Sequence, residues 1–268
     1  MPTIDVTLDP VIAQLGPIAL GWHGVLTALA VAVAVWLGVR RAVRVSGPAA
    51  PLDTVATWAI VGGLIGARLF HVLDHLPAYA ANPLAALAIW EGGIAVYGAF
   101  LGGIAGGALA ARRAGLPLWP LLDAAAPAVL VGQAIGRLGC LSNGDAWGAP
   151  TGAAWGIVYW HPHALLPAAL RGVPTHPYPL YEIVATLALL GALWLARRRL
   201  AAPGEMFLAA AIGYAAIRFG LTFFRQETLV LWGLQEAQLV ALATGALAVA
   251  LLLARRCRPH LTAAAPAP

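Results

Sequence analysis

Charge is scarce in this sequence of 268 residues. Only 10% of the residues are charged, 61% are hydrophobic, and the mean hydropathy is +0.81. A water-soluble domain has about 25% charged residues, so this composition excludes a soluble globular protein. The net charge of +5 comes from short arginine clusters between apolar runs, which do not form the continuous basic face of a nucleic-acid-binding protein. The sequence therefore predicts an integral membrane protein.

Lysine is absent and serine is almost absent. All 16 basic residues are arginine, so an arginine is informative here only through its position. The two serines are Ser46, in a connection between apolar runs, and Ser142, within LSNG. Neither has the G-x-S-x-G surroundings of a nucleophilic serine, which argues against an intramembrane serine protease. The first 17 residues contain Asp5 and Asp9 but no basic residue, so we expect no cleavable signal peptide and a first helix that is retained.

Apolar runs long enough to cross a membrane, about 20 residues each, occur seven times. They lie near residues 18–38, 54–73, 92–111, 117–138, 178–196, 204–224 and 233–254. The fourth run contains Pro120, Asp123 and Pro127, which a span tolerates where neighbouring helices satisfy the backbone. We expect an all-α, polytopic protein with one transmembrane domain over residues 1–268.

Arginine clusters follow every second apolar run. By the positive-inside rule these ends are cytoplasmic, which puts the N-terminus outside and the C-terminus inside. The segment from 140 to 177 is then an external loop or small cap. Cys140 and Cys257 would lie on opposite sides, which excludes a disulfide between them. The clusters comprise Arg40, Arg41, Arg44, Arg112, Arg113, Arg197, Arg198, Arg199, Arg255, Arg256 and Arg258.

Four further arginines lie in or at the ends of the spans: Arg68, Arg137, Arg218 and Arg225. An arginine at the centre of a span costs about 2.5–3.5 kcal/mol on insertion scales, so each needs a partner. The expected direction of the helices puts these arginines in outer halves, at the depth predicted for the polar residues His23, Tyr97, Tyr181 and Glu182. A guanidinium binds phosphate with two hydrogen bonds. The pattern favours a site for an anionic phospholipid facing the outer leaflet.

A purely structural role for these arginines is the simplest alternative. They would then pair with Glu91, Asp145, Glu182 and Glu227 and hold the bundle together. Glycines at four-residue spacing, such as Gly62 with Gly66, indicate close helix packing and no chemistry. His161, His163 and His176 lack the spacing of a zinc motif, and we expect no metal site and no cofactor.

One short stretch combines several of these features. Residues 136–148 read GRLGCLSNGDAWG. Arg137 is expected to close the fourth helix, and the following glycines allow turns or a close approach of the backbone. Asn143 and Asp145 add polar groups to the same short loop.

These residues resemble the prolipoprotein diacylglyceryl transferase family. Its signature is approximately G-R-x-G-N-F-x-N-G-E-x-x-G, and residues 136–148 match it at Arg137, Gly139, Asn143, Gly144 and Gly148. Further similar segments occur in the same order along nearly the whole chain: LGPIALGWHG, GGLIGARL, WEGGIAVYGAFLGG, HPYPLYE and GYAAIRFGLTFFRQ.

Several positions depart from the family pattern, which predicts a divergent member. The departures are Cys140 for Asn, Asp145 for Glu, Thr222 for Glu, Tyr97 for a His discussed as a base, His23 for Tyr, and Tyr178-Pro179 for Ser-Gln.

The resemblance implies transfer of a diacylglyceryl group from phosphatidylglycerol to the lipobox cysteine of a prolipoprotein signal peptide, at the outer face of the bacterial inner membrane. We expect Arg137 and Arg218 to hold the phosphate, and Asn143 to orient the headgroup. Arg68 and Arg225 are weaker candidates for binding phosphate. The other substrate-binding candidates are Glu182, His23, Gly98 and Gly148.

The sequence does not identify which residue is the base that removes the thiol proton. Tyr97 and Asp145 are the catalytic candidates, and Glu182 or His23 are alternatives. A phenol ionises near pH 10 and is a poor base at neutral pH. Arginines could also lower the pKa of the thiol without a dedicated base.

Two functions without this chemistry remain alternatives. A transporter or a lipid-binding protein could use the same arginines to hold an anion, but transport predicts polar residues along the inner half of the spans as well. A catalytically altered paralogue could retain lipid binding alone.

Overall fold

The computed structural model describes residues 3–16, 18–88, 92–93 and 95–257, so Glu91 and Arg258 lie outside the described residues. The chain forms two compact units, one of Met1–Ala34 with Ala126–Pro268 and one of Val35–Ala125. The unit boundaries fall within two long helices, α1 (Trp22–Ser46) and α5 (Leu118–Asn143).

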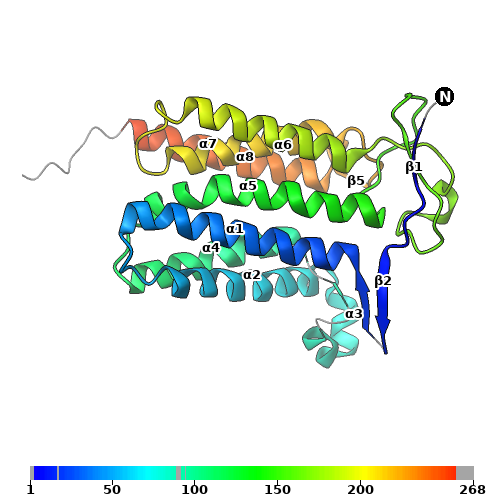
Figure 1. Ribbon diagram of the computed structural model, residues 1–268, viewed down its shortest axis with the longest axis horizontal. Helices are drawn as coiled ribbons and strands as arrows, with labels where there is room; N and C mark the ends of the chain where they lie inside the picture. The colour runs from blue at the N-terminus through cyan, green and yellow to red at the C-terminus, as the bar shows by residue number, and fades with distance from the viewer. Residues whose placement is uncertain (1–2, 17, 89–91, 94, 258–268) are drawn as a thin grey trace, which may run out of the picture. The chain divides into compact units, whose positions relative to one another are not determined.

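In the unit of residues 35–125, α2 (Leu52–Asp74) packs along α4 (Val96–Arg113) (Figure 1). Glycines line this contact. A Cβ atom on Gly102 would lie 2.1 Å from the carbonyl oxygen of Gly62, and one on Gly98 would lie 2.2 Å from that of Gly66. Only hydrogen fits in that space, so the close helix packing predicted from the glycine spacing is confirmed.

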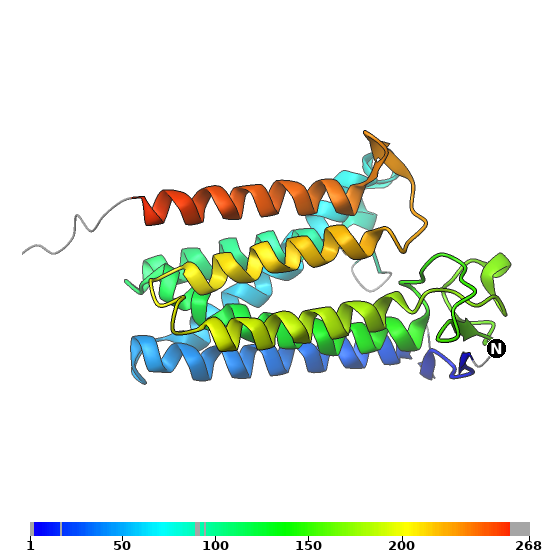
Figure 2. The same cartoon turned by 90° about the horizontal axis from the view of Figure 1, so that it is seen from above.

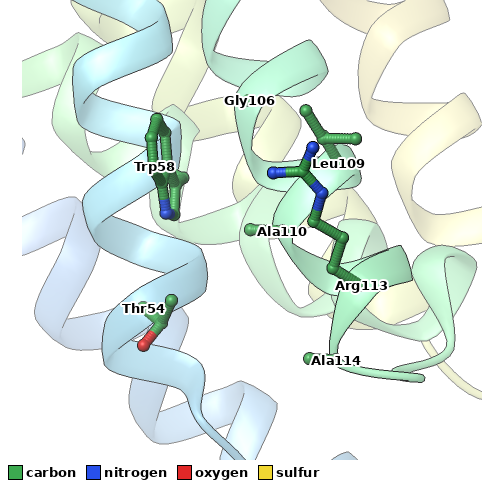
Figure 3. A pocket seen from close by; sticks show the side chains of 7 residues that line it. All are labelled: Thr54, Trp58, Gly106, Leu109, Ala110, Arg113 and Ala114. Carbon is green, nitrogen blue, oxygen red and sulfur yellow. The ribbon is translucent and has the colours of Figure 1, made fainter.

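Two short helical segments connect α2 to α4 within this unit. They are α3 (Leu76–Ala81) and a 3-10 turn, η1 (Pro83–Leu87). Near the arginine-rich ends of the helices, buried Ala42, Leu52 and Leu121 form a small core. A hollow of about 240 Å³ opens there between α2 and α4, with Trp58 on one side and Arg113 on the other (Figure 3). Arg113 is the one charged residue in the lining of this hollow, so we assign the hollow no catalytic role.

In the other unit, α6 (Tyr178–Ala196), α7 (Glu205–Thr222) and α8 (Glu236–Arg256) run side by side (Figure 2). Ala126 and Leu130 of α5 form a buried cluster with Leu193 of α6 and Met206 of α7. A capping box starts α8. The backbone N–H of Gln238 donates to the side chain of Gln235, and the backbone N–H of Gln235 donates to the side chain of Gln238. These helices therefore pack through apolar side chains, and a side-chain cap fixes the start of α8.

Residues between α5 and α6 form a small packed cap that contains β4 (Ile157–Tyr159) and a 3-10 turn, η3 (Ala168–Leu170). The N-terminal β1 (Ile4–Val6) pairs with β4 in parallel (Figure 1). Ile157, Tyr159 and Leu166 form a buried core for the cap. Two antiparallel hairpins complete this unit, one of β2 (Val11–Leu15) with β3 (Ile18–Gly21) and one of β5 (Leu229–Leu231) with β6 (Leu234–Gln235).

Six helices in the described part of the chain are long and apolar enough to cross a membrane: α1, α2, α5, α6, α7 and α8. An all-α protein with several helices able to cross a membrane is therefore confirmed, whereas the count of seven spans and the orientation of the termini stay predictions. The third predicted span, near residues 92–111, corresponds to α4, which has 18 residues and ends in Arg112 and Arg113; it is not among these six helices.

The end of the fourth predicted span differs from the expectation. Arg137 does not close the helix, because α5 continues to Asn143. Gly144 ends it with a φ of 70°, and its N–H donates to the carbonyl of Cys140 at 2.9 Å. A glycine in this conformation is a common helix terminator. The signature stretch is thus helical over its first eight residues, and Pro127 lies inside the same helix.

We expect Gly102→Ala to destabilise the α2–α4 pair. Its new methyl would meet a backbone oxygen, and overpacking of this kind costs about 1–3 kcal/mol. Thermal unfolding in detergent measures the effect. Gly191→Ala in α6 is the matched control, since its Cβ would meet nothing within 4 Å; equal melting temperatures for the two variants would contradict the close packing.

Candidate functional site

A buried carboxylate lies at the centre of the candidate site. Glu182 on α6 is 1% exposed. Its Oε1 accepts hydrogen bonds from Arg137 Nη2 at 2.9 Å and from the Tyr214 hydroxyl at 2.6 Å. Its Oε2 lies 3.4 Å from Nη1 of Arg218. Both arginines predicted to bind phosphate are therefore held by one acid from a third helix.

Helical spacing explains how these side chains meet. Tyr178 and Glu182 are four residues apart on α6, as are Tyr214 and Arg218 on α7, and residues at that spacing share one face of a helix. Arg218 Nη1 donates to the Tyr178 hydroxyl at 2.7 Å, and the Thr222 hydroxyl donates to the carbonyl of Arg218 at 2.6 Å. The two facing helices thus build one polar network.

The network carries more positive than negative charge. Two guanidinium groups share one carboxylate, and the arginine side chains of Arg137 and Arg218 are 20% and 15% exposed. Two of the five N–H donors of Arg137 have partners among the described residues, Glu182 and the Cys140 sulfur. Buried positive charge with donors to spare is suited to an anionic ligand such as a phosphate.

Arg225 forms a separate pair beside this network. Its Nη2 lies 2.6 Å from Oε1 of Glu227. The centre of its guanidinium lies 5.0 Å from the ring centre of Tyr178, and that of Arg218 lies 5.8 Å from the same ring. Tyr178 thus touches both arginines, while Glu227 balances the charge of Arg225.

A second cluster joins the start of α1 to the end of α5. His23 Nδ1 lies 3.4 Å from Oδ2 of Asp145, and Asn143 Nδ2 lies 3.5 Å from the same oxygen. Candidate ligand atoms of His23, Cys140 and Asp145 all lie within 4.8 Å of one another. Arg137 Nη1 donates to Cys140 Sγ at 3.5 Å, so this cluster adjoins the arginine network.

The cap packs tightly against this region. A Cβ atom on Gly148 would lie 2.5 Å from the carbonyl oxygen of His176, so Gly148 permits a close backbone approach, as its position in the signature suggests. Tyr159 donates to the carbonyl of Leu141 at 2.9 Å. Burial, reinforced by the charge of Asp145, raises the pKa of the Tyr159 phenol above its ordinary value, so this phenol stays protonated and serves as a structural donor.

Arg68, Tyr97 and Gly98 belong to the other unit. All five N–H donors of Arg68 bond to backbone carbonyls, those of Ala85, Ala86, Ala88, Gly92 and Gly93. Gly98 lies in the glycine contact of α2 with α4. The Tyr97 hydroxyl is buried and has no hydrogen-bond partner within the described ranges. The predicted common depth of these residues with Arg137 stays a prediction.

Two of the cap histidines contact the N-terminal segment. His163 Nδ1 lies 3.2 Å from Oδ1 of Asp9, and His161 Nδ1 lies 3.8 Å from it. The backbone N–H of Val11 donates to Asp9 and lowers the pKa of its carboxyl below the ordinary value. The three side chains could hold a metal ion geometrically. The contacts of the two histidines with Asp9 link the N-terminal segment to the cap.

A family model described as prolipoprotein diacylglyceryl transferase matches residues 10–254. The chain belongs to this family. Relatives named phosphatidylglycerol–prolipoprotein diacylglyceryl transferase include that of Synechococcus elongatus, 36% identical with 90% of this chain and 85% of the relative covered. The relative from Geobacillus kaustophilus is 35% identical, covering 94% of each chain, and that from Aromatoleum aromaticum is 37% identical, covering 96% of this chain and 98% of the relative.

Sequence reasoning missed Tyr214 in this family member and left Tyr178 without a role. A signal for both was available, because each stands four residues before a charged residue already singled out, Arg218 and Glu182. Among the proposed structural partners, Glu182 pairs with two arginines and Glu227 with a third, whereas Asp145 lies beside His23. Only the folded chain shows that one acid serves two arginines.

We expect Glu182→Gln to destabilise the protein by about 3 kcal/mol or more, because removing one partner of a buried ion pair leaves uncompensated charge. Thermal unfolding in detergent measures the loss. Glu227→Gln is the matched control, since Glu227 is 35% exposed and partners one arginine. A smaller loss for Glu182→Gln than for Glu227→Gln would contradict the central role of Glu182.

Proposed function

We propose that the protein transfers a diacylglyceryl group from phosphatidylglycerol to the lipobox cysteine of a prolipoprotein. The observation that carries this proposal is the pair of guanidinium groups held on the buried Glu182 carboxylate. A net positive network suits the phosphodiester of an anionic lipid, and the names of the relatives describe this reaction. Family membership and site chemistry thus support the same reaction.

Each residue of the network has a role in this proposal. Arg137 and Arg218 bind the phosphate and stabilise the charge that develops on it as the glycerol phosphate leaves. Glu182 holds both guanidinium groups in place; the Tyr178 hydroxyl accepts from Arg218, and the Tyr214 hydroxyl donates to Glu182. Asn143 orients the headgroup, and Arg225, paired with Glu227, lies beside the Tyr178 ring.

We assign Arg68 a different role from the one expected. Since backbone carbonyls occupy all of its donors, it positions the segment before α4. Gly98 and Gly148 allow close packing of backbone in their respective units. Tyr97 stays a candidate for substrate contact through its buried hydroxyl.

The proposed topology has seven spans in the bacterial inner membrane, as one transmembrane domain whose cap, near residues 140–177, faces outward. We include α4 as a span, the third along the chain, because omitting it would put Arg112 and Arg113 outside the alternation of arginine clusters. A site at the outer leaflet could then meet secreted precursors as they emerge.

The test of the reaction is mass spectrometry of a lipobox peptide incubated with the purified protein and phosphatidylglycerol. We expect a thioether-linked diacylglyceryl adduct on the cysteine of the peptide, and its loss by about 100-fold or more with Arg137→Ala or Arg218→Ala. Arg171→Ala in the cap is the matched control. A full yield of adduct with both site variants would overturn the assignment.

A second variant separates chemistry from folding. Arg137→Gln keeps a polar side chain and leaves the Glu182 carboxylate paired with Arg218, so no buried charge of the network loses its partner and the protein should still insert. We expect it to lose the adduct as well. If wild-type protein binds phosphatidylglycerol but forms no adduct, the chain is a catalytically altered relative.

The topology can be tested with cysteine labelling. Cys257 is exposed and Cys140 is buried, so a membrane-impermeant maleimide should label Cys257 only in inside-out vesicles. In a Thr3→Cys, Cys257→Ala variant, the same reagent should label intact spheroplasts. Labelling of both positions from one side would contradict a seven-span arrangement.

A further inference from the structure

Three of the positions that depart from the family pattern meet in space. His23 comes from the first turn of α1, Cys140 from the last turn of α5, and Asp145 from the two residues that follow α5. Candidate ligand atoms of all three lie within 4.8 Å of one another. His23 is 122 positions from Asp145 in the sequence. The fold thus brings an imidazole, a thiol and a carboxylate together beside the arginine network.

Backbone packing fixes the imidazole in this position. A Cβ atom on Gly139 would lie 3.1 Å from the Cα of His23 and 3.3 Å from its Nδ1, so the start of α1 rests directly on α5. His23 Nδ1 and Asp145 Oδ1 are buried atoms that complete no hydrogen bond in the part of the chain the structure describes. The His23 side chain as a whole is 39% exposed. The contact of α1 with Gly139 therefore places the ring beside Asp145 without a completed hydrogen bond between them, while part of the side chain stays accessible.

This arrangement has the chemistry of a positioned proton acceptor. A carboxylate beside one ring nitrogen fixes the tautomer and the orientation of an imidazole, leaving the other nitrogen to accept a proton. Cys140 connects the imidazole to Arg137, whose Nη1 lies 3.5 Å from the sulfur. A base at this place would stand beside the proposed phosphate site.

We propose that His23 accepts the proton of the incoming cysteine thiol and that Asp145 positions the His23 ring. This inference rests on the proposed function. The S–H bond of the peptide breaks and its proton moves to the imidazole, and the thiolate then attacks the glyceryl carbon. The bond from that carbon to the phosphate oxygen breaks with its electron pair on oxygen. The imidazolium returns its proton to the departing glycerol phosphate or to water.

Glu182 is less suited to accept the proton, and Cys140 is less suited to attack the lipid. Glu182 already accepts from two arginines and from Tyr214, so its lone pairs are in use. Attack by Cys140 itself would form a thioether on the protein, and a thioether sulfur is a poor leaving group, so the diacylglyceryl group would stop there.

A metal ion is also disfavoured at this cluster. The guanidinium of Arg137 lies within hydrogen-bonding distance of the Cys140 sulfur, and its positive charge would repel a cation bound to that sulfur. The same charge favours the transient thiolate of a substrate. The surroundings of the cluster therefore point to proton transfer.

The experiment compares wild-type protein with His23→Ala in the lipobox peptide assay, with and without free imidazole. We expect the variant to lose about 100-fold or more in the rate of adduct formation. Added imidazole should restore part of the rate, in proportion to the concentration of its neutral form, because the removed ring leaves room for it. A merely structural histidine would give no such dependence.

Several outcomes overturn the inference. A His23→Ala variant with an undiminished rate does so, and so does a folded variant that binds phosphatidylglycerol but does not respond to imidazole. A mass increase on the protein that maps to Cys140 would assign the attack to that thiol instead. If wild-type protein makes no adduct at all, the proposed function itself fails, which is a distinguishable result. His75→Ala, which removes an exposed histidine of the other unit, is the matched control.

Asp145 provides an independent test as a positioning residue. We expect Asp145→Asn to lower kcat with little change in the KM for phosphatidylglycerol, and Asp145→Glu to recover most of the rate, since it restores the carboxylate. An unchanged kcat in Asp145→Asn would remove Asp145 from the proposal.

Discussion

The site depends on one buried carboxylate with two positive neighbours. Two arginines in an apolar bundle would repel each other and would lack partners, and Glu182 removes both problems at once because each of its oxygens faces a different guanidinium. Because Glu182 sets the positions of the arginines before a ligand binds, they need not reorganise during the reaction. One acid for two cations also leaves a surplus of positive charge. The same interaction thus joins α5, α6 and α7 and creates the anion-binding character of the site.

Arginines in this chain have two distinct uses that their residue type cannot distinguish. The guanidinium of Arg137 has two partners and remains partly accessible, which leaves it able to bind a ligand. That of Arg68 is saturated by five backbone carbonyls and serves as an internal support. A fully bonded guanidinium would have to break those bonds to hold a phosphate, and each bond of a charged donor contributes about 1.5–3 kcal/mol. Hydrogen-bond saturation therefore distinguishes the structural Arg68 from the candidate ligand-binding Arg137.

Three of the departures from the family pattern lie together in space. A histidine, a cysteine and an aspartate occupy neighbouring positions around the end of α5, and the shorter side chain of Asp145 lies beside the ring of His23. Considered singly, each substitution suggests lost chemistry. Together they place an imidazole beside a carboxylate next to Arg137, and in the proposed mechanism these three departures concern the transfer of the proton more than the binding of an anion.

The sequence by itself determined the membrane class, the approximate extent of the long apolar helices, and the residues of the signature. Those features depend on local composition and on spacing along the chain, as in the glycines of α2 and α4 or the apolar run of α5. Tertiary structure alone decided which charges meet. Glu182 could have paired with any of four intramembrane arginines, His23 is far in sequence from Asp145, and the end of α5 depends on the left-handed conformation of Gly144. Pairing between distant helices depends on their relative rotation and register, which side-chain packing sets and which no local pattern records.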